Sequence, residues 1–216
     1  MSLVLHHCHE TRSMRVLWLL NELGLDFELV VHPFGRALRE PDYLAVSPLG
    51  RVPCLVEDGR AMTESLATIE YLCETRNAGT LFRAPGTAER RDWLQWLHFS
   101  ETVAVHVAAV TQQLIALNDP ALRSPTIVKL ETRRLEKALG VLDERLQGRD
   151  YVLASGFSAV DIAIGWSVHG ARLFTPLDAF PEVEAYYDRL AARPAFRSSL
   201  PASGAPDRVY TEPRYY

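Results

Sequence analysis

The stretch that decides the fold is residues 47–65, with the sequence SPLGRVPCLVEDGRAMTES. Residues 54–57 have the composition of a short strand, and Asp58-Gly59 is among the strongest sequence signals for a tight hairpin. Pro53 directly precedes that strand, where it can donate no hydrogen bond to a neighbouring strand. Glu64-Ser65 then begins a predicted helix. The stretch therefore combines a hairpin, a backbone position that cannot pair and an acid–hydroxyl pair.

Upstream of this stretch, the chain alternates strand and helix signals. Residues 3–7 and 27–31 are predicted strands. Residues 13–23 between them form a predicted helix, which ends before Gly24, a residue suited to the left-handed conformation that often follows a helix. A strand, a helix and a strand at this spacing imply a parallel strand pair joined by a right-handed crossover. With the hairpin and a closing helix over residues 65–74, this part of the chain forms a small α/β unit.

The rest of the chain is predicted to be all-helical. After Pro85-Gly86, apolar residues recur at steps of three, four or seven, as they do on one face of a helix. The main helices are predicted from Trp93 to Leu117, from Ser124 to the residues before Gly148, from Ser158 onward, and from Pro181 to Arg193, where Pro194 ends the helix. The tail from Pro201 is predicted to be extended or loosely ordered. The sequence thus predicts two domains, residues 1–80 and 88–216.

Composition restricts the possible partners. The formal net charge of −4 argues against nucleic acid and against an anionic membrane, because both favour a basic surface. No apolar run approaches the ~18 residues that span a bilayer, and the first residues lack the pattern of a secretory signal. Cys8, Cys54 and Cys73 are scattered without a CxxC pair, so neither a disulfide framework nor a zinc site is predicted. We expect no bound metal and a cytoplasmic location.

Four segments carry a family resemblance. They are TRSMRVLWLLNELGLDFELV (residues 11–30), SPLGRVPCLVEDG (47–59), TES (63–65) and FSAVDIAIG (157–165). Together they resemble the cytosolic glutathione S-transferases over essentially the whole chain, and the first is most similar to bacterial and fungal members with a Ser-Arg-Ser-type start to the first helix. The resemblance implies a thioredoxin-like α/β domain that binds glutathione, followed by an all-α domain that forms the pocket for an electrophile.

The resemblance gives Pro53 a function. In this family the Val52-Pro53 peptide bond is cis, and the main chain of Val52 turns outward, where it pairs with the extended tripeptide glutathione as a sheet edge would. Arg51, Val52 and Pro53 are accordingly expected to contact glutathione, the co-substrate. The sequence alone would not predict a cis bond, because only about 5–6% of X-Pro bonds in folded proteins are cis.

Glu64 and Ser65 are expected to bind the γ-glutamyl end of glutathione. The first N–H groups of a helix are unpaired and carry a partial positive charge, so Ser65 offers both its N–H and its hydroxyl to a carboxylate. Glu64 brings an opposite charge to the ammonium group beside that carboxylate. The structural alternative is that Thr63 or Ser65 only caps the helix.

Thr11 and Ser13 are the candidates for activating the thiol. A free cysteine thiol has a pKa of about 8.5, so only a few per cent is thiolate at pH 7. A hydroxyl that donates to the sulfur, together with the N-terminus of the first helix, would stabilise the thiolate. Matching residues 15–18 to the family places Thr11 where close relatives carry serine, although threonine departs from the usual Ser, Tyr or Cys. Ser13 is the alternative donor, unless it is a simple N-cap.

Two other residues have both a structural and a functional interpretation. Cys8 follows the first strand and could form mixed disulfides with glutathione, as in omega-like members, but it lies too early in the sequence for that role, and a buried, inert thiol is favoured. His106 lies on the long helix on the same side as Phe99, Val103 and Val110. A single helical histidine is usually structural, and the alternative is that His106 lines the electrophile pocket.

A helix capping box is predicted at Ser158-Ala159-Val160-Asp161, with Asp in place of the usual Glu or Gln. Phe157 and Ile162 are placed as its hydrophobic staple. In the family this motif lies in the core of the helical domain and serves folding. We therefore assign it no role in the active site.

The predicted function is that of a glutathione S-transferase, in which the glutathione thiolate attacks a small apolar electrophile, a reaction of detoxification. One alternative is a glutathione-dependent peroxidase or thiol-exchange enzyme that uses the same site. Another is a non-catalytic protein that only binds glutathione. Family members pair through both domains across a two-fold axis, so a homodimer is expected. Neither nucleic acid nor a membrane is an expected partner.

Overall fold

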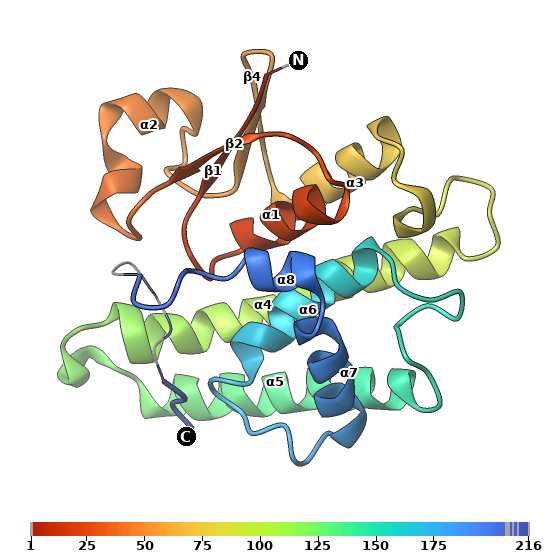
Figure 1. Cartoon of the computed structure of the whole chain (residues 1–216). Helices are drawn as coiled ribbons and strands as arrows, with labels where there is room; N and C mark the ends of the chain where they lie inside the picture. Colours follow the sequence, from red (N-terminus) through yellow and green to blue (C-terminus); the bar gives the residue numbers. More distant parts are fainter. Residues whose placement is uncertain (1, 206–207, 209, 211, 216) are drawn as a thin grey trace. The chain divides into compact units, whose positions relative to one another are not determined.

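The computed structural model describes residues 2–205, 208, 210 and 212–215 (Figure 1). The chain forms two compact units. The first unit comprises Met1–Phe82 and Ala192–Val209, and the second comprises Arg83–Ala191 and Tyr210–Tyr216. This division differs from the predicted one because a stretch near the C-terminus belongs to the first unit.

The first unit is a mixed four-stranded sheet with helices, which confirms the predicted thioredoxin-like fold class. The strand order is β2-β1-β3-β4, with β1 parallel to β2 and the other neighbours antiparallel. The elements are β1 (Leu3–His7), α1 (Ser13–Glu22), β2 (Glu28–Val31), η1 (Arg36–Arg39), α2 (Pro41–Val46), β3 (Cys54–Glu57), β4 (Arg60–Thr63), α3 (Ser65–Thr75), η2 (Gly79–Leu81) and α8 (Pro194–Ser198). Each strand predicted from the sequence is present, and so are the helices predicted to begin at Ser13 and at Ser65.

The hairpin predicted from Asp58-Gly59 is confirmed. These two residues have φ values of 46° and 79°. Two consecutive positive φ values are typical of the type I′ turn, whose twist matches that of the flanking strands. In the resulting ladder Cys54 lies opposite Thr63. Pro53, which precedes Cys54, and Glu64, which follows Thr63, therefore lie at the same end of the strand pair.

The sequence patterns did not predict α2, the helix between β2 and β3. It begins at Pro41, a favoured first position, and carries Asp42 in its first turn, where a negative charge is stabilising. After α2, the chain passes Gly50, whose φ is 58°. A Cβ at Gly50 would lie 2.5 Å from the backbone oxygen of Leu38, so only glycine fits at this position. This close approach holds the loop that leads into Arg51.

Contacts with α1 explain why the stretch near the C-terminus belongs to the first unit. Pro194 follows the end of a helix, as predicted, but it also lies in the first turn of α8, where its missing N–H costs no hydrogen bond. The ring of Phe196 packs edge-on against Trp18, with 4.9 Å between ring centroids. The guanidinium of Arg193 pairs with the carboxylate of Glu22, with Nε 2.7 Å from Oε1. The sequence patterns did not predict α8.

The tail from Pro201, predicted to be extended or loosely ordered, is only partly described. Residues 206, 207, 209, 211 and 216 lie outside the described residues. Among the residues that are described beyond Pro201, none lies in a helix or strand, in agreement with the prediction. Arg208 in this tail pairs with the buried carboxylate of Glu10, with Nη2 2.8 Å from Oε1.

The second unit is all-helical, as predicted. Its elements are α4 (Arg90–Thr111), η3 (Gln112–Ala116, a π-helical turn), η4 (Pro120–Leu122), α5 (Pro125–Leu146), α6 (Ala159–Ala171) and α7 (Pro181–Ala191). The hydroxyl of Ser124 caps α5 by accepting the N–H of Ile127 at 3.3 Å. α6 is buried along its whole length and packs against α4. There, a Cβ at Gly170 would lie 2.9 Å from Val107 Cγ1, so glycine allows the two helices to approach closely.

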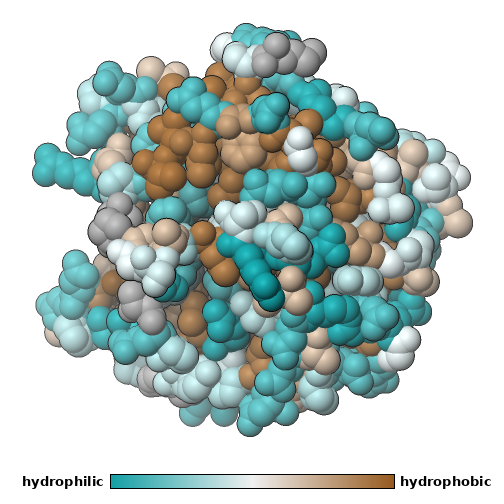
Figure 2. Space-filling view, in the orientation of Figure 1, coloured by the Kyte–Doolittle hydropathy of each residue, from teal (hydrophilic) through white to brown (hydrophobic). Residues whose placement is uncertain are grey.

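Large apolar side chains are exposed on both units. In the first unit they are Leu29, Val31, Phe34 and Leu49, and in the second they include Val105, Ile127, Leu130 and Val141. Figure 2 shows hydrophobic residues gathered where the strands of the first unit lie. Leu49 is 78% exposed, the largest value among these side chains. Contiguous exposed apolar surface of this kind is typical of an interaction site.

Among the residues that the structure describes, no helix is both long enough and apolar enough to cross a membrane.

Candidate functional site

Three segments of the first unit meet at one end of its sheet. In the antiparallel ladders His6 pairs with Cys54, and Cys54 pairs with Thr63. The residues that follow β1, precede β3 and follow β4 therefore lie at the same end. These are the segments that carry Thr11, Val52-Pro53 and Glu64-Ser65. The fold thus brings together the residues that the sequence had assigned to one site.

The hydroxyls of Thr11 and Ser13 lie side by side at the start of α1. Their oxygen atoms are 2.9 Å apart. Thr11 Oγ1 donates to the carbonyl of Cys8 at 2.9 Å, and it accepts a long hydrogen bond, 3.4 Å, from the N–H of Ser13. Thr11 is partly exposed, whereas Ser13 is fully buried. Of the two hydroxyls, that of Thr11 is therefore the more accessible to a ligand.

Ser13 is not the N-cap of α1. The cap position is Arg12, which makes no side-chain cap hydrogen bond, and Ser13 is the first helical residue. The hydroxyl of Ser13 instead turns back toward β1: it accepts the N–H of Cys8 at 3.2 Å and lies 3.1 Å from the carbonyl of Cys8. It also lies 2.7 Å from Nδ1 of His7, which is fully buried. Ser13 is thus part of a buried hydrogen-bond network.

The loop before β3 contains the cis peptide bond expected from the family, between Val52 and Pro53. Its main chain is held from α2, because the carbonyl of Arg51 accepts the hydroxyl of Tyr43 at 2.7 Å and that of Ser47 at 2.9 Å. Tyr43 is buried, and burial raises the pKa of its hydroxyl to about 12, so it remains a hydrogen-bond donor at neutral pH. The side chain of Arg51 is exposed, and Val52 is half-buried.

At the start of α3, Glu64 occupies the N-cap position with a φ of 69°, in a region that residues other than glycine rarely adopt. Such local backbone strain is common at ligand-binding sites. Ser65 is the first helical residue, and no side chain caps the helix. The capping alternative for Thr63 or Ser65 is therefore wrong. The hydroxyl of Ser65 instead accepts a 3.1 Å hydrogen bond from Nη1 of Arg15.

Arg15 links the two helix starts. It lies in the first turn of α1, two residues after Ser13, and its side chain is fully buried. A buried guanidinium is stable only when its N–H groups are hydrogen-bonded, and one of them donates to Ser65. The charge of Arg15 therefore lies next to the position where the carboxylate of the γ-glutamyl residue is predicted to bind.

Cys8 does not reach the surface. Its side chain is fully buried and packs in a cluster with Leu38 and Tyr43, with Val52 against it. The three cysteines of the chain are all buried and form no disulfide. These positions agree with the interpretation of Cys8 as a buried thiol.

His106 lies in the second unit, where its Nδ1 is 2.7 Å from Oε2 of Glu131 on α5. Burial would raise the pKa of the Glu131 carboxyl, but the hydrogen bonds from His106 and Arg134 outweigh it and leave that pKa lowered. The contact agrees with the structural interpretation of His106. A place in the electrophile pocket remains a prediction.

The capping box at Ser158 and Asp161 is confirmed in the second unit. The fully buried carboxylate of Asp161 accepts the N–H of Ser158 at 2.8 Å, the N–H of Val152 at 3.0 Å and the hydroxyl of Tyr186 at 3.0 Å. Burial is the main effect on this carboxyl, and it raises the pKa to about 6 despite the hydrogen bonds. Asp161 thus joins the start of α6 to the preceding loop and to α7.

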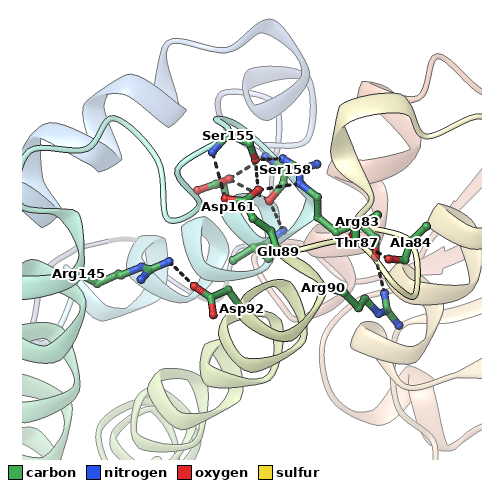
Figure 3. Close-up of polar contacts among 11 residues, drawn as sticks. Arg83, Ala84, Thr87, Glu89, Arg90, Asp92, Arg145, Ser155, Ser158 and Asp161 are labelled. Carbon is green, nitrogen blue, oxygen red and sulfur yellow. Dashed lines mark hydrogen bonds and ion pairs between the residues drawn. The ribbon is translucent and has the colours of Figure 1, made fainter.

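A second polar cluster lies beside this capping box. Figure 3 shows Arg83, Glu89 and Ser155 directed toward one another, with Ser158 and Asp161 next to them. The guanidinium of Arg83 pairs with Glu89 at 3.1 Å, and both residues hydrogen-bond to the hydroxyl of Ser155. The hydrogen bond from Ser155 is the main cause of the lowered pKa of Glu89. These contacts all lie within the second unit and link its residues to one another, so we interpret the cluster as structural.

Four residues of the site have no assignment from the sequence. Arg15 is a charged residue in an otherwise apolar helical face, a pattern that signals a buried partner. Tyr43 lies in α2 and Ser47 at its end, and the available signal for this helix is Pro41 followed by an acidic residue. His7 ends β1, and no local pattern distinguishes it.

Among the described residues, no group of three or more metal-ligating side chains occurs.

The sequence of the chain is similar to those of known proteins over both units. The chain matches the family model "Glutathione S-transferase, N-terminal domain" over residues 11–75 and the model "Glutathione S-transferase, C-terminal domain" over residues 108–189. It is 31% identical over 203 residues to Glutathione S-transferase 3 of Zea mays, which covers 89% of this chain and 90% of that protein. It is 27% identical over 208 residues to Glutathione S-transferase 3 of Schizosaccharomyces pombe, which covers 90% of this chain and 85% of that protein.

A similar solved structure is that of the glutathione transferase URE2P6 from Phanerochaete chrysosporium, in complex with oxidized glutathione. Its TM-score with this chain is 0.81 at 25% sequence identity, and the match covers 92% of this chain and 94% of that chain.

Proposed function

The chain belongs to the glutathione S-transferase family and is a transferase, and on this basis we propose that it binds glutathione in its first unit and joins the glutathione sulfur to small apolar electrophiles. The observation that carries the proposal is the meeting of three segments at one end of the sheet. They supply a hydroxyl at Thr11, the main chain of Val52 at the cis peptide bond and the start of α3 at Ser65. Each suits a different part of one extended tripeptide.

The start of α3 binds the γ-glutamyl carboxylate in this proposal. The N–H and hydroxyl of Ser65 donate to it, the helix N-terminus attracts it, and the neighbouring charge of Arg15 adds to that attraction. Arg15 donates to the Ser65 oxygen, so the Ser65 proton is free to point toward the ligand. Glu64, whose side chain is exposed, binds the ammonium group. The similar fungal transferase solved with oxidized glutathione supports the same class of ligand.

The sulfur then lies toward Thr11, because the main chain of Val52 holds the middle of the tripeptide between the two ends of the site. The Thr11 hydroxyl donates to the sulfur and stabilises the thiolate. With a chloronitrobenzene, the thiolate forms a bond to the ring carbon and chloride leaves with the electron pair of the broken bond. The proton of the thiol is released to water before this step. Each unit by which the thiol pKa falls requires ~1.4 kcal/mol of preferential stabilisation of the thiolate.

Burial of Cys8 disfavours the thiol-exchange alternative. An exchange enzyme that uses its own cysteine needs an accessible thiolate, and Cys8 is fully buried in the cluster with Leu38 and Tyr43. A peroxidase that uses only the glutathione thiolate would need the same site as the transferase. The two activities are therefore separated by substrate and not by site residues.

The proposal is tested by two measurements on the same preparation. Binding to immobilised glutathione, with elution by free glutathione, tests the ligand. Turnover of chlorodinitrobenzene, compared with reduction of cumene hydroperoxide, then tests the reaction. Conjugation with specific binding supports the transferase, binding without either turnover leaves a glutathione-binding protein, and absence of binding overturns the proposal.

We also propose that two copies of the chain form a homodimer. The exposed apolar side chains of the first unit, among them Leu49, and those on α4 and α5 of the second unit support an interface between copies. Analytical ultracentrifugation should give twice the mass of the 24.3 kDa chain. The three cysteines form no disulfide, and this supports a reducing compartment such as the cytoplasm.

A further inference from the structure

His7 is a buried residue that the proposed function does not use. It is the last residue of β1 and fully buried, and its Nδ1 lies 2.7 Å from the hydroxyl oxygen of Ser13. Its other ring nitrogen, Nε2, is buried without a hydrogen-bond partner among the residues that the structure describes. The ring of His9 packs edge-on against it, with 5.4 Å between centroids. Among the residues that the structure describes, the ring of His7 therefore has one hydrogen-bond partner, the Ser13 hydroxyl, which belongs to the candidate site.

The unpartnered nitrogen determines which tautomer His7 adopts. Burial lowers the pKa of His7 to about 3; the nearby His9 adds to the lowering, and a backbone hydrogen bond with Ser13 opposes it. The ring is therefore neutral and carries one proton. If that proton were on Nε2, a buried N–H would have no acceptor. Orphaned buried N–H groups are rarer than buried acceptors that lack a donor. The proton therefore belongs on Nδ1, and His7 donates to Ser13.

Donation from His7 restricts what Ser13 can accept. A hydroxyl oxygen has two lone pairs. One accepts the N–H of Cys8 at 3.2 Å, and the other accepts the Nδ1–H of His7. Ser13 can then not accept the proton of Thr11, although the two oxygens are only 2.9 Å apart. The proton of Ser13 in turn can point to the carbonyl of Cys8, 3.1 Å away.

This arrangement frees the Thr11 proton. The carbonyl of Cys8 has two hydroxyl donors within reach, Thr11 at 2.9 Å and Ser13 at 3.1 Å. When Ser13 supplies it, Thr11 can rotate its proton toward a ligand without leaving the carbonyl unpaired. With the opposite tautomer, Ser13 would donate to His7 and could not supply Cys8. The Thr11 proton would then be drawn to Cys8 or Ser13 and away from the sulfur.

We propose that His7 is a positioning residue for the transferase reaction: by donating to Ser13 it directs the proton of Thr11 toward the glutathione sulfur. The inference rests on the proposed function, since it concerns the same sulfur. It assigns Thr11 and Ser13 different roles, with Thr11 as the donor to sulfur and Ser13 as the residue that passes on the orientation set by His7.

The tautomer of His7 can be measured without glutathione. Long-range ¹H–¹⁵N correlation spectra of the ligand-free protein distinguish a protonated Nδ1 from a protonated Nε2, and His7→Asn assigns the signal by its loss. We expect Nδ1 to carry the proton from pH 6 to pH 8. A proton on Nε2 would overturn the inference, whatever the enzyme does.

The effect on the sulfur is measured by the ultraviolet absorbance of the bound thiolate as a function of pH. His7→Leu removes the donor, and we expect the pKa of bound glutathione to rise by about half a unit, comparable to the shift expected for Ser13→Ala, which corresponds to a thiolate fraction up to about threefold lower near neutral pH. His7→Asn places an amide N–H near the position of Nδ1 and should restore most of the shift. A purely structural role of His7 would change stability in both variants and leave the thiol titration unchanged, and that result would overturn the inference.

A control comes from the adjacent residue. His6 also lies in β1, but its Nδ1 contacts Nε2 of His32 at 2.9 Å and not the hydroxyl network. His6→Leu should leave the thiol titration unchanged.

If wild type shows no bound thiolate, the proposed function fails, and the tautomer measurement still decides the direction of the hydrogen bond between His7 and Ser13. If wild type binds the thiolate and His7→Leu does not shift its pKa, only the inference fails. If His7→Leu does not fold, the thiol titration of His7→Asn and the tautomer of wild-type His7 decide whether the inference holds.

Discussion

Replacing Ser65 by alanine separates its contact with Arg15 from its proposed contact with glutathione. Ser65 is 5% exposed and accepts a 3.1 Å hydrogen bond from the fully buried guanidinium of Arg15. In the ligand-free protein, Ser65→Ala removes the acceptor of one charged N–H group. Hydrogen bonds to charged groups contribute about 1.5–3 kcal/mol, so the free energy of unfolding should fall by about that amount.

The second consequence of Ser65→Ala appears only when glutathione is present. The variant loses one donor to the γ-glutamyl carboxylate but keeps the N–H of residue 65 and the helix N-terminus. A loss of about 1–3 kcal/mol in binding free energy corresponds to a dissociation constant raised about 5- to 150-fold. Isothermal titration calorimetry with glutathione measures this change, and urea unfolding without glutathione measures the change in stability.

Thr68 offers a matched control in the same helix. It is fully buried one turn after Ser65, and its hydroxyl donates to the carbonyl of Glu64 at 2.9 Å. Thr68→Ala should cost about 1 kcal/mol of stability and leave the dissociation constant unchanged, because the N–H of Thr68 still pairs with that carbonyl. If Ser65→Ala behaves like Thr68→Ala, with lower stability and unchanged affinity, then Ser65 only satisfies Arg15 and the proposed carboxylate site is wrong.

Three further predictions concern the hydroxyl pair and the capping box. Thr11→Ala should raise the pKa of bound glutathione by about one unit with little change in affinity. Ser13→Ala should raise that pKa less and should lower stability by about 1–3 kcal/mol, because the buried donors of Cys8 and His7 lose their acceptor. Thiolate absorbance measures the pKa and urea unfolding measures the stability; a larger pKa shift in Ser13→Ala than in Thr11→Ala would exchange the two roles. Replacing both Ser158 and Asp161 by Ala should lower stability by at least ~1 kcal/mol and leave glutathione affinity per folded molecule unchanged in calorimetry; a selective loss of affinity would contradict a purely structural motif. Burial raises the pKa of Asp161 from 3.8 to about 6, so between these pH values the folded protein holds a proton that the unfolded chain has lost. The protonated group therefore stabilises the fold below about pH 4, and this contribution, up to about 3 kcal/mol, is lost as the pH rises to about 6. Asp161→Asn should abolish the corresponding slope of the free energy of unfolding against pH between pH 4 and pH 7, and an unchanged slope would show that another group causes it.

Much of the fold follows from the sequence by itself. Asp58-Gly59 specified the hairpin because a type I′ turn needs two positive φ values, a requirement within two residues. Ser158 and Asp161 specified the start of α6 because a capping box satisfies N–H groups within a single turn. Apolar periodicity indicated the helices of the second unit for the same reason. In each case the interacting groups are neighbours in the chain, so the pattern and the structure that it produces occupy the same few residues.

The candidate site was only partly available from the sequence. Thr11, Pro53 and Ser65 were identified because each stands at the junction of a strand with another element, where local patterns are clear, and because the family resemblance joined them. The hydrogen bond from Arg15 to Ser65 was not predicted, because it joins residues that are 50 positions apart. That contact depends on how α1 and α3 pack against the sheet.

The tertiary structure alone decided the contacts that position the site. The carbonyl of Arg51 is held by Tyr43, α8 packs on α1 through Phe196, and Ser13 turns inward to His7. None of these has a sequence signature, because a buried polar atom takes whichever partner the packed chain brings within hydrogen-bond distance. The identity of that partner is therefore a property of the assembled unit. Local sequence specifies which elements form, whereas the need to satisfy buried donors and acceptors, which arises only once those elements pack, selects the partners that surround the sulfur.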